Sequence, residues 1–394
     1  MEPLHGPIRD YAWGSRTVIA GLQGRTVPTP GPEAELWLGA HPASPAMVHQ
    51  GEARVSLLEL LAAEPRRWLG DEVLARFDGR LPFLMKLLAP EAPLSLQAHP
   101  NPEQARLGYA ADQALPPTAQ RNYVDPYHKP EVLVAIAPFE ALCGFRDPGV
   151  SAAVLEAFDI PALKPVVAAL RGGVDGLRDA VERLLSWPAV DRAGLVETVR
   201  GTDLGPDFAA EQELVRWLAG WYPADPGVLV ALLLNHVRLE PGMAIWMPAG
   251  NLHAYLRGAG VEIMAGSDNV LRGGLTPKHV DVPELLRVLR FEVLDDPLLA
   301  PVPVAPGVVG WRVPIDDFAL HRVRLDAEVP QARLALTGPR VVLGGSGSVR
   351  VRDAAGEVTV EPGRAAISAA DGGPLLFSGT GEVFVGSAGL SLPA

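Results

Sequence analysis

Residues 242–253 read GMAIWMPAGNLH, the most specific of the three segments that indicate the fold. An apolar strand headed by Gly242 runs into a tight turn shaped by Pro248 and Gly250, and a second strand begins near His253. Such a turn lets the second strand direct one imidazole into the interior of a β structure. A single Pro-x-Gly-x-x-His arises often by chance, so its weight depends on two earlier segments.

The first of these segments, residues 93–100, reads PLSLQAHP. On a strand, Ser95, Gln97 and His99 share one face, because side chains alternate between the two faces. A row of polar side chains facing an interior is costly unless each has a bonding partner. A metal ion would satisfy Gln97 and His99 together. The alternative is a hydrogen-bonded histidine of the core.

The second segment, residues 125–136, reads DPYHKPEVLVAI, and Glu131 opens its apolar strand. A carboxylate at that position requires a cation unless it lies just outside the strand in water. Gln97, His99, Glu131 and His253 together form a mixed nitrogen and oxygen donor set. Zn, Mn, Fe, Co and Ni all fit this set, because no thiolate selects among them. Fewer than six protein ligands leaves positions for water or substrate oxygens.

A cluster of charges follows in residues 260–279, GVEIMAGSDNVLRGGLTPKH, which contains Glu262, Asp268, Arg272 and Lys278. Most such clusters are solvated loops with a surface salt bridge. The apolar flanks argue against that interpretation here. Lysine is also scarce, since only four of the 34 basic residues are lysines: Lys86, Lys129, Lys164 and Lys278. Each lysine either marks a place that needs a compact ammonium or is retained by chance.

Composition limits the class of protein. A chain of 394 residues that is 48% hydrophobic can bury at least two cores. The net charge of −12 argues against a nucleic-acid partner, which requires a basic surface. The single cysteine, Cys143, excludes an intrachain disulfide and favours a reducing cytoplasm. The first residues lack an apolar signal segment, and the longest apolar run, 228–234, is far too short for a membrane span.

The pattern along the chain predicts a mainly β protein with inserted helices. Residues 55–78 have helical spacing with Ser56 as an N-cap, and a short helix is expected at 282–289. Glycine and proline are spread between apolar runs elsewhere, which indicates short strands and tight turns. The predicted units are a discontinuous β domain that carries the motifs (1–150 with 222–292), a helical insertion (151–221) and a C-terminal β domain (293–394).

The quoted segments, with YAWGS at 11–15 and AELWLGAHP at 34–42, resemble the hallmark segments of type I phosphomannose isomerases. Their order and spacing hold from about residue 8 to residue 292. The resemblance implies two cupin (jelly-roll) β domains with the helices inserted into the first. The C-terminal domain resembles a cupin without a metal site, because the last histidine of the chain is His321.

The resemblance also implies roles for particular residues. The family's ligands for one Zn²⁺ per chain match Gln97, His99, Glu131 and His253. Its essential arginine matches Arg272, and its phosphate-contacting residues match Lys86, Ser95 and Lys278. His128 and Lys129 match positions implicated in ring opening or proton transfer. Tyr127 departs from the family, which often has Asn there.

The expected reaction is the interconversion of D-mannose 6-phosphate and D-fructose 6-phosphate through a cis-enediol, by a monomeric chain whose partner is a small sugar phosphate. The metal and Arg272 would stabilise the negative charge that grows on the carbonyl oxygen. The base stays open among Lys129, Glu262, Asp268 and His128.

Two alternatives are a metal-dependent cupin dioxygenase and a non-catalytic sugar-binding cupin. The dioxygenase would consume oxygen and would not need a cationic cluster for phosphate. The sugar-binding cupin would show no turnover.

Overall fold

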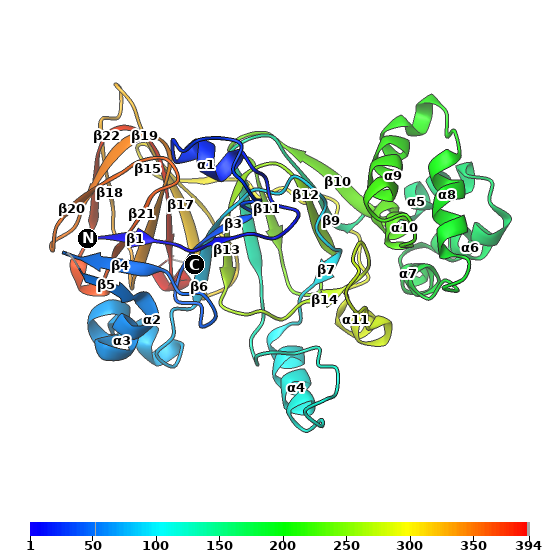
Figure 1. Cartoon of the computed structure of the whole chain (residues 1–394), viewed down its shortest axis with the longest axis horizontal. Helices are drawn as coiled ribbons and strands as arrows, with labels where there is room; N and C mark the ends of the chain where they lie inside the picture. Colours follow the sequence, from blue (N-terminus) through cyan, green and yellow to red (C-terminus); the bar gives the residue numbers. More distant parts are fainter. Residues whose placement is uncertain (52, 392–394) are drawn as a thin grey trace.

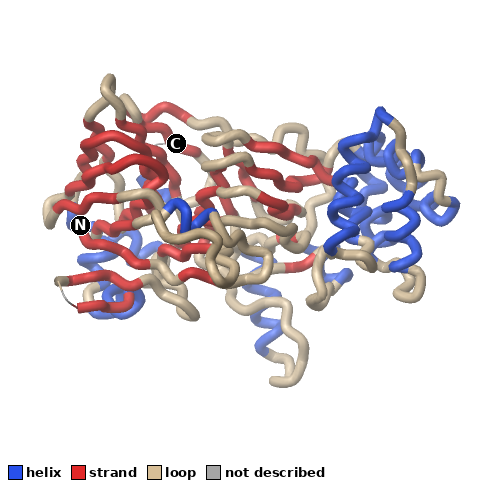
Figure 2. Tube along the Cα trace, turned by 45° about the horizontal axis from the view of Figure 1, so that its top comes forward, coloured by secondary structure: helices blue, strands red, loops and turns tan. Residues whose placement is uncertain are grey.

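Three β-sheets lie side by side, and a group of helices covers one end of the molecule (Figure 1). The computed structural model describes residues 1–51 and 53–391. Figure 2 shows the same division, with strands on one side and most helices at the opposite end. The prediction of a mainly β chain with helices is confirmed.

The first sheet has eleven strands and contains most of the C-terminal part of the chain. Its main path, in spatial order, is β15 (Val302–Ala305), β16 (Val308–Trp311), β17 (Ala319–Leu325), β22 (Leu375–Ser387), β19 (Arg340–Arg352), β21 (Ala365–Ser368), β1 (Glu2–His5), β4 (Met47–Gln50) and β5 (Ala53–Ser56). Two further strands, β18 (Gln331–Leu334) and β20 (Glu357–Val360), pair with β22 and β19. The first residues of the chain therefore share a sheet with the last strands. The predicted domain boundaries stay a prediction.

The other two sheets hold the strands predicted around the sequence motifs. The six-stranded sheet has the order β11 (Ala244–Met247), β8 (Glu131–Ala135), β13 (Gly260–Ala265), β6 (Phe83–Leu88), β3 (Glu35–Leu38) and β2 (Ile8–Arg9). The five-stranded sheet has the order β10 (Leu234–Leu239), β9 (Phe139–Phe145), β12 (His253–Arg257), β7 (Gln97–Ala98) and β14 (Leu271–Arg272).

Alternation along β8 explains how these sheets are layered. Val132 and Val134 enter the apolar core shared with the eleven-stranded sheet. Leu133 and Ala135 point the other way, into a core shared with the five-stranded sheet. The six-stranded sheet is therefore the middle layer, buried on both faces, as the continuous apolar run of β8 requires. Glu131 has the parity of Leu133 and faces the space between the six-stranded and five-stranded sheets.

The helices occupy two regions, one near the sheets and one at the end of the molecule. Those outside the helical end are α1 (Val18–Leu22), α2 (Leu57–Ala63), α3 (Pro65–Arg76), α4 (Pro102–Gln113) and α11 (Val282–Val288). The helical end contains α5 (Pro148–Ala157), α6 (Lys164–Arg171), α7 (Leu177–Leu185), α8 (Arg192–Gly201), α9 (Ala209–Trp221) and α10 (Gly227–Val230). Their apolar faces pack against the outer face of the five-stranded sheet through a core that includes Leu142, Leu184 and Leu229.

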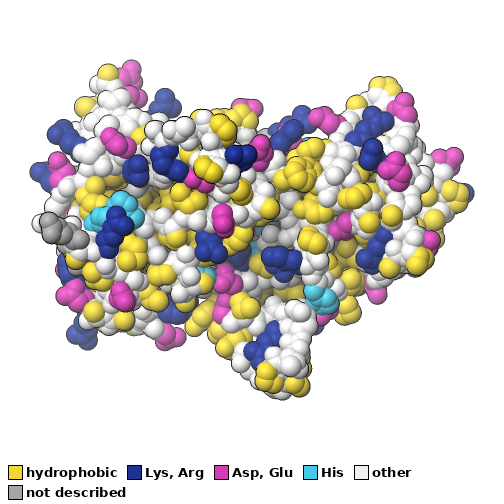
Figure 3. Space-filling model, in the orientation of Figure 1, with side chains coloured by type: hydrophobic (Ala, Val, Ile, Leu, Met, Phe, Trp, Pro, Cys, Tyr) yellow, Lys and Arg dark blue, Asp and Glu magenta, His cyan; other side chains and the backbone are white. Residues whose placement is uncertain are grey.

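Two local predictions are confirmed at residue level. The Ser56 hydroxyl accepts a hydrogen bond from the Leu58 amide, and the Glu59 carboxylate accepts one from the Ser56 amide, which completes the capping box of α2. The helix expected at 282–289 is α11. Among the described helices, none is long and apolar enough to cross a membrane. On the face drawn in Figure 3, acidic and basic side chains are interspersed.

Candidate metal centre

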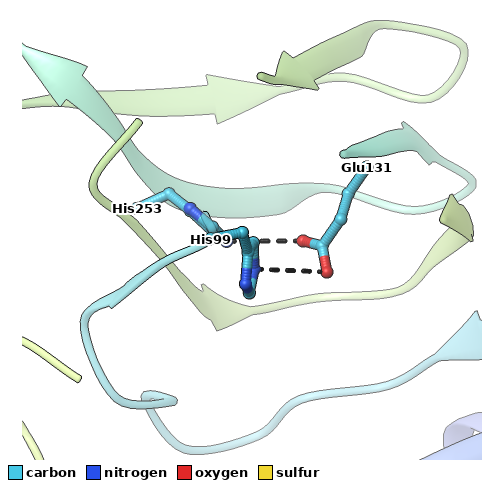
Figure 4. A group of neighbouring side chains, drawn as sticks. All are labelled: His99, Glu131 and His253. Carbon is cyan, nitrogen blue, oxygen red and sulfur yellow. Dashed lines mark ion pairs between the residues drawn. The ribbon is translucent and has the colours of Figure 1, made fainter. Parts of the chain in front are cut away.

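Three buried side chains from the six-stranded and five-stranded sheets meet between those sheets (Figure 4). His99 follows β7, Glu131 begins β8 and His253 begins β12. Their ligand atoms all lie within 4.8 Å of one another. The His99 Nε2 atom is 3.5 Å from Glu131 Oε1, and the His253 Nε2 atom is 3.3 Å from Glu131 Oε2. Three of the four ligands predicted from the sequence therefore lie together.

Both imidazoles are oriented by backbone carbonyls. His99 Nδ1 lies 2.7 Å from the Asn269 carbonyl oxygen, and His253 Nδ1 lies 3.0 Å from that of Asn251. A carbonyl only accepts, so each Nδ1 carries the proton and donates. Burial, followed by the nearby Lys129 ammonium, lowers the pKa of His99 to about 4, so this ring is neutral at pH 7.

A neutral ring with its proton on Nδ1 presents a lone pair at Nε2. At His99 this lone pair points at a carboxylate oxygen, which also only accepts. Two acceptors in a dry site repel unless a cation lies beside them; the Lys129 ammonium contacts Glu131 and lies 3.5 Å from His99 Nε2, and a metal ion would serve both histidines. Oxygen and imidazole nitrogen are donors that a divalent transition metal prefers, and carbonyl contacts at Nδ1 are the usual way to orient such ligands. The donor set therefore fits a metal ion.

Gln97, the fourth predicted ligand, lies beside His253. Gln97 pairs directly with His253 in the antiparallel register of β7 and β12. Directly opposed residues project from the same face of a sheet, so the Gln97 amide is on the histidine side. Gln97 also pairs with Arg272 of β14, which brings that residue to the same face.

The Glu131 carboxylate is held in place by polar contacts with neighbouring side chains. Its side chain is buried and contacts the Lys129 ammonium, and the Tyr255 hydroxyl lies 3.4 Å from its Oε2 atom. Burial raises the pKa of Glu131, but the Lys129 ammonium and the two imidazoles outweigh burial and hold the pKa well below its usual range. The carboxylate is therefore charged and able to bind a cation.

A second buried charge cluster lies along the same space. The Lys86 ammonium is 3.0 Å from Glu262 Oε2 and 3.7 Å from Glu35 Oε1. All three side chains are buried, and Lys86 lies opposite both Glu262 and Trp37 in the strand register. Burial raises the pKa of Glu262; Lys86 opposes this shift and Glu131 adds to it, so the net change is upward. Glu262 is therefore a carboxyl that can exchange a proton more readily near neutral pH.

The remaining predicted residues are less enclosed. Arg272 is half-buried, and no residue in the described part of the chain offers its guanidinium a hydrogen bond or an ion pair. Burial lowers its pKa. Asp268 is exposed and lies 2.8 Å from His41 Nε2, a contact that lowers the Asp268 pKa. Ser95 is half-buried and Lys278 is exposed.

His128 and Lys129 point in different directions although they are adjacent in sequence. Lys129 contacts Glu131 in the centre, whereas His128 Nε2 lies 3.0 Å from the Asp317 carboxylate, outside the cluster. Tyr127, the position that departs from the family pattern, lies under the guanidinium of Arg80 at 3.5 Å from the ring centroid.

Sequence reasoning missed several residues of the site. Tyr255 could have been found, because it lies two residues after His253 on the same strand and so on the same face. Glu35 and His41 stand in the quoted segment 34–42 but gave no signal of their own. Asn269 fixes the loop after β13, since its side-chain amide donates to the carbonyls of Asp125 and Tyr127.

The chain is similar in sequence to proteins of known function. Residues 1–148 match the family model described as phosphomannose isomerase type I, catalytic domain. The mannose-6-phosphate isomerase of Escherichia coli (strain K12) is 34% identical over 392 residues, which cover 97% of this chain and 98% of that protein. The human protein of the same name is 31% identical over 386 residues, covering 88% of each.

Solved structures agree over nearly the whole length. A variant of phosphomannose isomerase from Salmonella typhimurium has a TM-score of 0.88 and 33% identity, covering 98% of this chain and 99% of that one. A zinc-bound mannose 6-phosphate isomerase has a TM-score of 0.89 and 33% identity, with the same coverage.

Proposed function

The chain belongs to the type I phosphomannose isomerases, and from this premise we propose how its residues interconvert mannose 6-phosphate and fructose 6-phosphate. Its fold is the cupin fold predicted from the sequence. Zinc is the cofactor, and the dioxygenase and sugar-binding alternatives have no support from the relatives.

The observation that carries the proposal is the arrangement of acceptors around Glu131. The Nε2 atom of each histidine lies 3.3–3.5 Å from a carboxylate oxygen, and each Nδ1 atom is committed to a backbone carbonyl. We assign the zinc ligands to Gln97, His99, Glu131 and His253. When bound there, zinc supplies a Lewis acid that polarises the carbonyl of the open-chain sugar.

Glu262 is our choice among the four candidate bases for moving the proton between C1 and C2. Its burial and raised pKa support this choice, because a general base works best with a pKa near the working pH. The Lys86 ammonium at 3.0 Å orients the carboxylate.

The other three candidate bases have charged partners, as Glu262 does, so the choice rests on the burial and the raised pKa of Glu262. The Lys129 ammonium contacts Glu131, His128 pairs with Asp317, and the Asp268 carboxylate pairs with His41. We therefore propose that Lys129 orients Glu131. Ring opening by His128 stays a prediction.

Arg272 is the proposed stabiliser of the enediolate. Its guanidinium has no anionic partner among the described residues and projects from the face that carries Gln97. It can therefore receive the negative charge that develops on the sugar oxygen in the transition state.

We propose that Lys278, which is exposed, and Ser95, which is half-buried, bind the phosphate. Phosphate binding by Lys86 stays a prediction. The two carboxylates around Lys86 favour a role in holding Glu262 instead, because they already neutralise its ammonium.

The assignment of the base can be tested by isotope exchange in D₂O. Wild type should incorporate deuterium at C2 of mannose 6-phosphate during turnover. Glu262→Gln should keep its zinc and lose exchange and isomerisation together by roughly 10²-fold or more. Asp268→Asn is the matched control, since it makes the same change at the exposed candidate. Normal exchange in Glu262→Gln with loss in Asp268→Asn would move the base to Asp268.

We further propose that the chain acts as a monomer in the cytoplasm. All assigned ligands and charges come from one chain, which supports a site that needs no second subunit. Light scattering on the purified protein would show a mass near 42 kDa for a monomer, and a mass near twice that value would contradict the proposal.

A further inference from the structure

Three arginines without ionic partners lie on the outer face of the eleven-stranded sheet. Arg333 is on β18, and Arg350 and Arg352 are on β19. All three side chains are exposed, and no residue in the described part of the chain offers any of them an ion pair or a hydrogen bond. Other exposed arginines of the chain, such as Arg106 and Arg121, also have no ion-pair partner among the described residues, but they do not lie together on one sheet face. What sets Arg333, Arg350 and Arg352 apart is their position on neighbouring strands, with Glu357 of β20 as the one acidic residue in the same groove.

The strand register brings the three arginines onto one face. Arg333 pairs with Leu376 of β22, and Leu376 pairs with Arg352. In the next row along the strands, Gln331 pairs with Ser378, and Ser378 pairs with Arg350. Directly opposed residues share a face, and residues two apart on one strand share it as well. The two rows therefore place three guanidinium groups around one patch.

This patch lines a groove of about 520 Å³. Gln331 and Ser378 contribute neutral donors to the groove, and Glu357, which pairs with Arg352 in the register, is its one acidic lining residue. Strands β18 and β20 lie at the end of the molecule opposite the helices α5 to α9 (Figure 1). The groove is therefore separate from the metal centre, which lies between the other two sheets.

The spacing indicates the class of ligand. Arg333 and Arg352 are two strand spacings apart, about 10 Å, and Arg350 is about 7 Å along the strand from Arg352. Guanidinium forks bind phosphate oxygens in a bidentate manner. Three guanidinium groups spread over this distance match two linked phosphate groups better than a single phosphate group. A long polyanion is disfavoured, because the protein has a net charge of −12 and would repel the part of the polyanion that extends outside the groove.

We propose that this groove binds a small diphosphate-type anion at a site distinct from the catalytic centre. The cross-strand row of Arg333, Leu376 and Arg352, with Arg350 beside it, provides the binding surface. The C-terminal sheet thereby has a binding function of its own, in addition to packing against the catalytic sheets.

The test is calorimetric titration of the zinc-loaded full chain with inorganic pyrophosphate at constant ionic strength. We expect Arg333→Gln and Arg350→Gln each to weaken the groove's affinity about ten-fold, because each removes one charge-assisted pair of hydrogen bonds. The control is Arg106→Gln on α4, whose arginine is also exposed and unpaired within the described residues. Pyrophosphate contacts at the metal centre contribute equally to all these proteins.

The outcomes separate specific binding from general charge effects. Weaker binding in both groove variants, with unchanged kcat and KM and an unchanged Arg106→Gln isotherm, supports the site. Identical isotherms for wild type and the two groove variants would overturn it. A loss of the same size in Arg106→Gln would also overturn it, because the effect would then come from net charge alone.

Discussion

Replacing Lys86 by methionine tests the buried charge cluster beside the metal centre. The ammonium is within 3.0 Å of Glu262 and 3.7 Å of Glu35, and all three side chains are buried. Methionine keeps most of the volume but removes the cation. Glu35 retains a hydrogen bond from Trp37 Nε1 at 2.5 Å, so Glu262, which keeps only the Tyr255 hydroxyl as a neutral partner, is the carboxylate that loses its cation.

The size of the effect follows from how Glu262 can respond. A buried carboxylate that has lost its cation binds a proton instead of staying charged. Protonating a group of ordinary pKa about 4.3 costs about 1.4 kcal/mol per pH unit above that value, hence about 4 kcal/mol at pH 7.5. This agrees with the 3–5 kcal/mol typical of breaking a buried ion pair from one side.

The pH dependence has a definite sign. In the variant, the native state holds a proton on Glu262 that the unfolded state has released, so the variant loses stability as pH rises above the ordinary glutamate pKa. Because the pKa of Glu262 is already raised in the wild type, the loss relative to wild type should be at most about 4 kcal/mol at pH 7.5 and at most about 1.6 kcal/mol at pH 5.5.

The measurement is urea unfolding of the zinc-loaded proteins at both pH values, followed by tryptophan fluorescence. Lys164→Met is the matched control, because Lys164 is exposed at the start of α6, and its loss should stay within about 0.5 kcal/mol. A Lys86→Met loss that is no larger than this, or that is the same at both pH values, would refute the reasoning.

Three further predictions concern other residues. Arg272→Ala should fold, keep its zinc and lose roughly 10²-fold or more in kcat; a normal kcat with only a weaker KM would move Arg272 to a binding role. Lys278→Ala should lower kcat/KM for mannose 6-phosphate but barely change the poor rate on mannose, with Lys278→Arg rescuing partly; equal proportional losses on both sugars would show that Lys278 does not contact the phosphate. Burial raises the pKa of the Cys143 thiol to about 12, so a thiol reagent at pH 8 should modify it only after unfolding in urea, and rapid modification of the native chain would contradict this.

The proposed ligands could be picked out from sequence because each of them lies in a short motif that is recognisable from its near neighbours. Near neighbours in the chain are enough to recognise three features. These are the alternation of Gln97 and His99, the charge of Glu131 at an apolar strand, and the turn before His253. The three residues that converge in Figure 4 were all among them.

The second charge cluster was not accessible in the same way, because it depends on cross-strand register. Lys86 meets Glu262 through the pairing of β6 with β13, and it meets Trp37 through the pairing of β6 with β3. These strands are far apart in sequence, and no local pattern sets their register. The pairing of β1 with β21, which joins the start of the chain to the C-terminal sheet, could not be predicted for the same reason.

The central claim is that zinc bound by His99, Glu131 and His253 enables isomerisation in this chain. The most direct measurement is a coupled assay on mannose 6-phosphate with purified protein before chelation, after chelation and after zinc is returned, with His253→Ala in parallel. We expect activity to disappear with the metal and to return with zinc, and His253→Ala to hold little zinc and to stay inactive. Full zinc occupancy in His253→Ala, or undiminished turnover by the metal-free chain, would contradict the account.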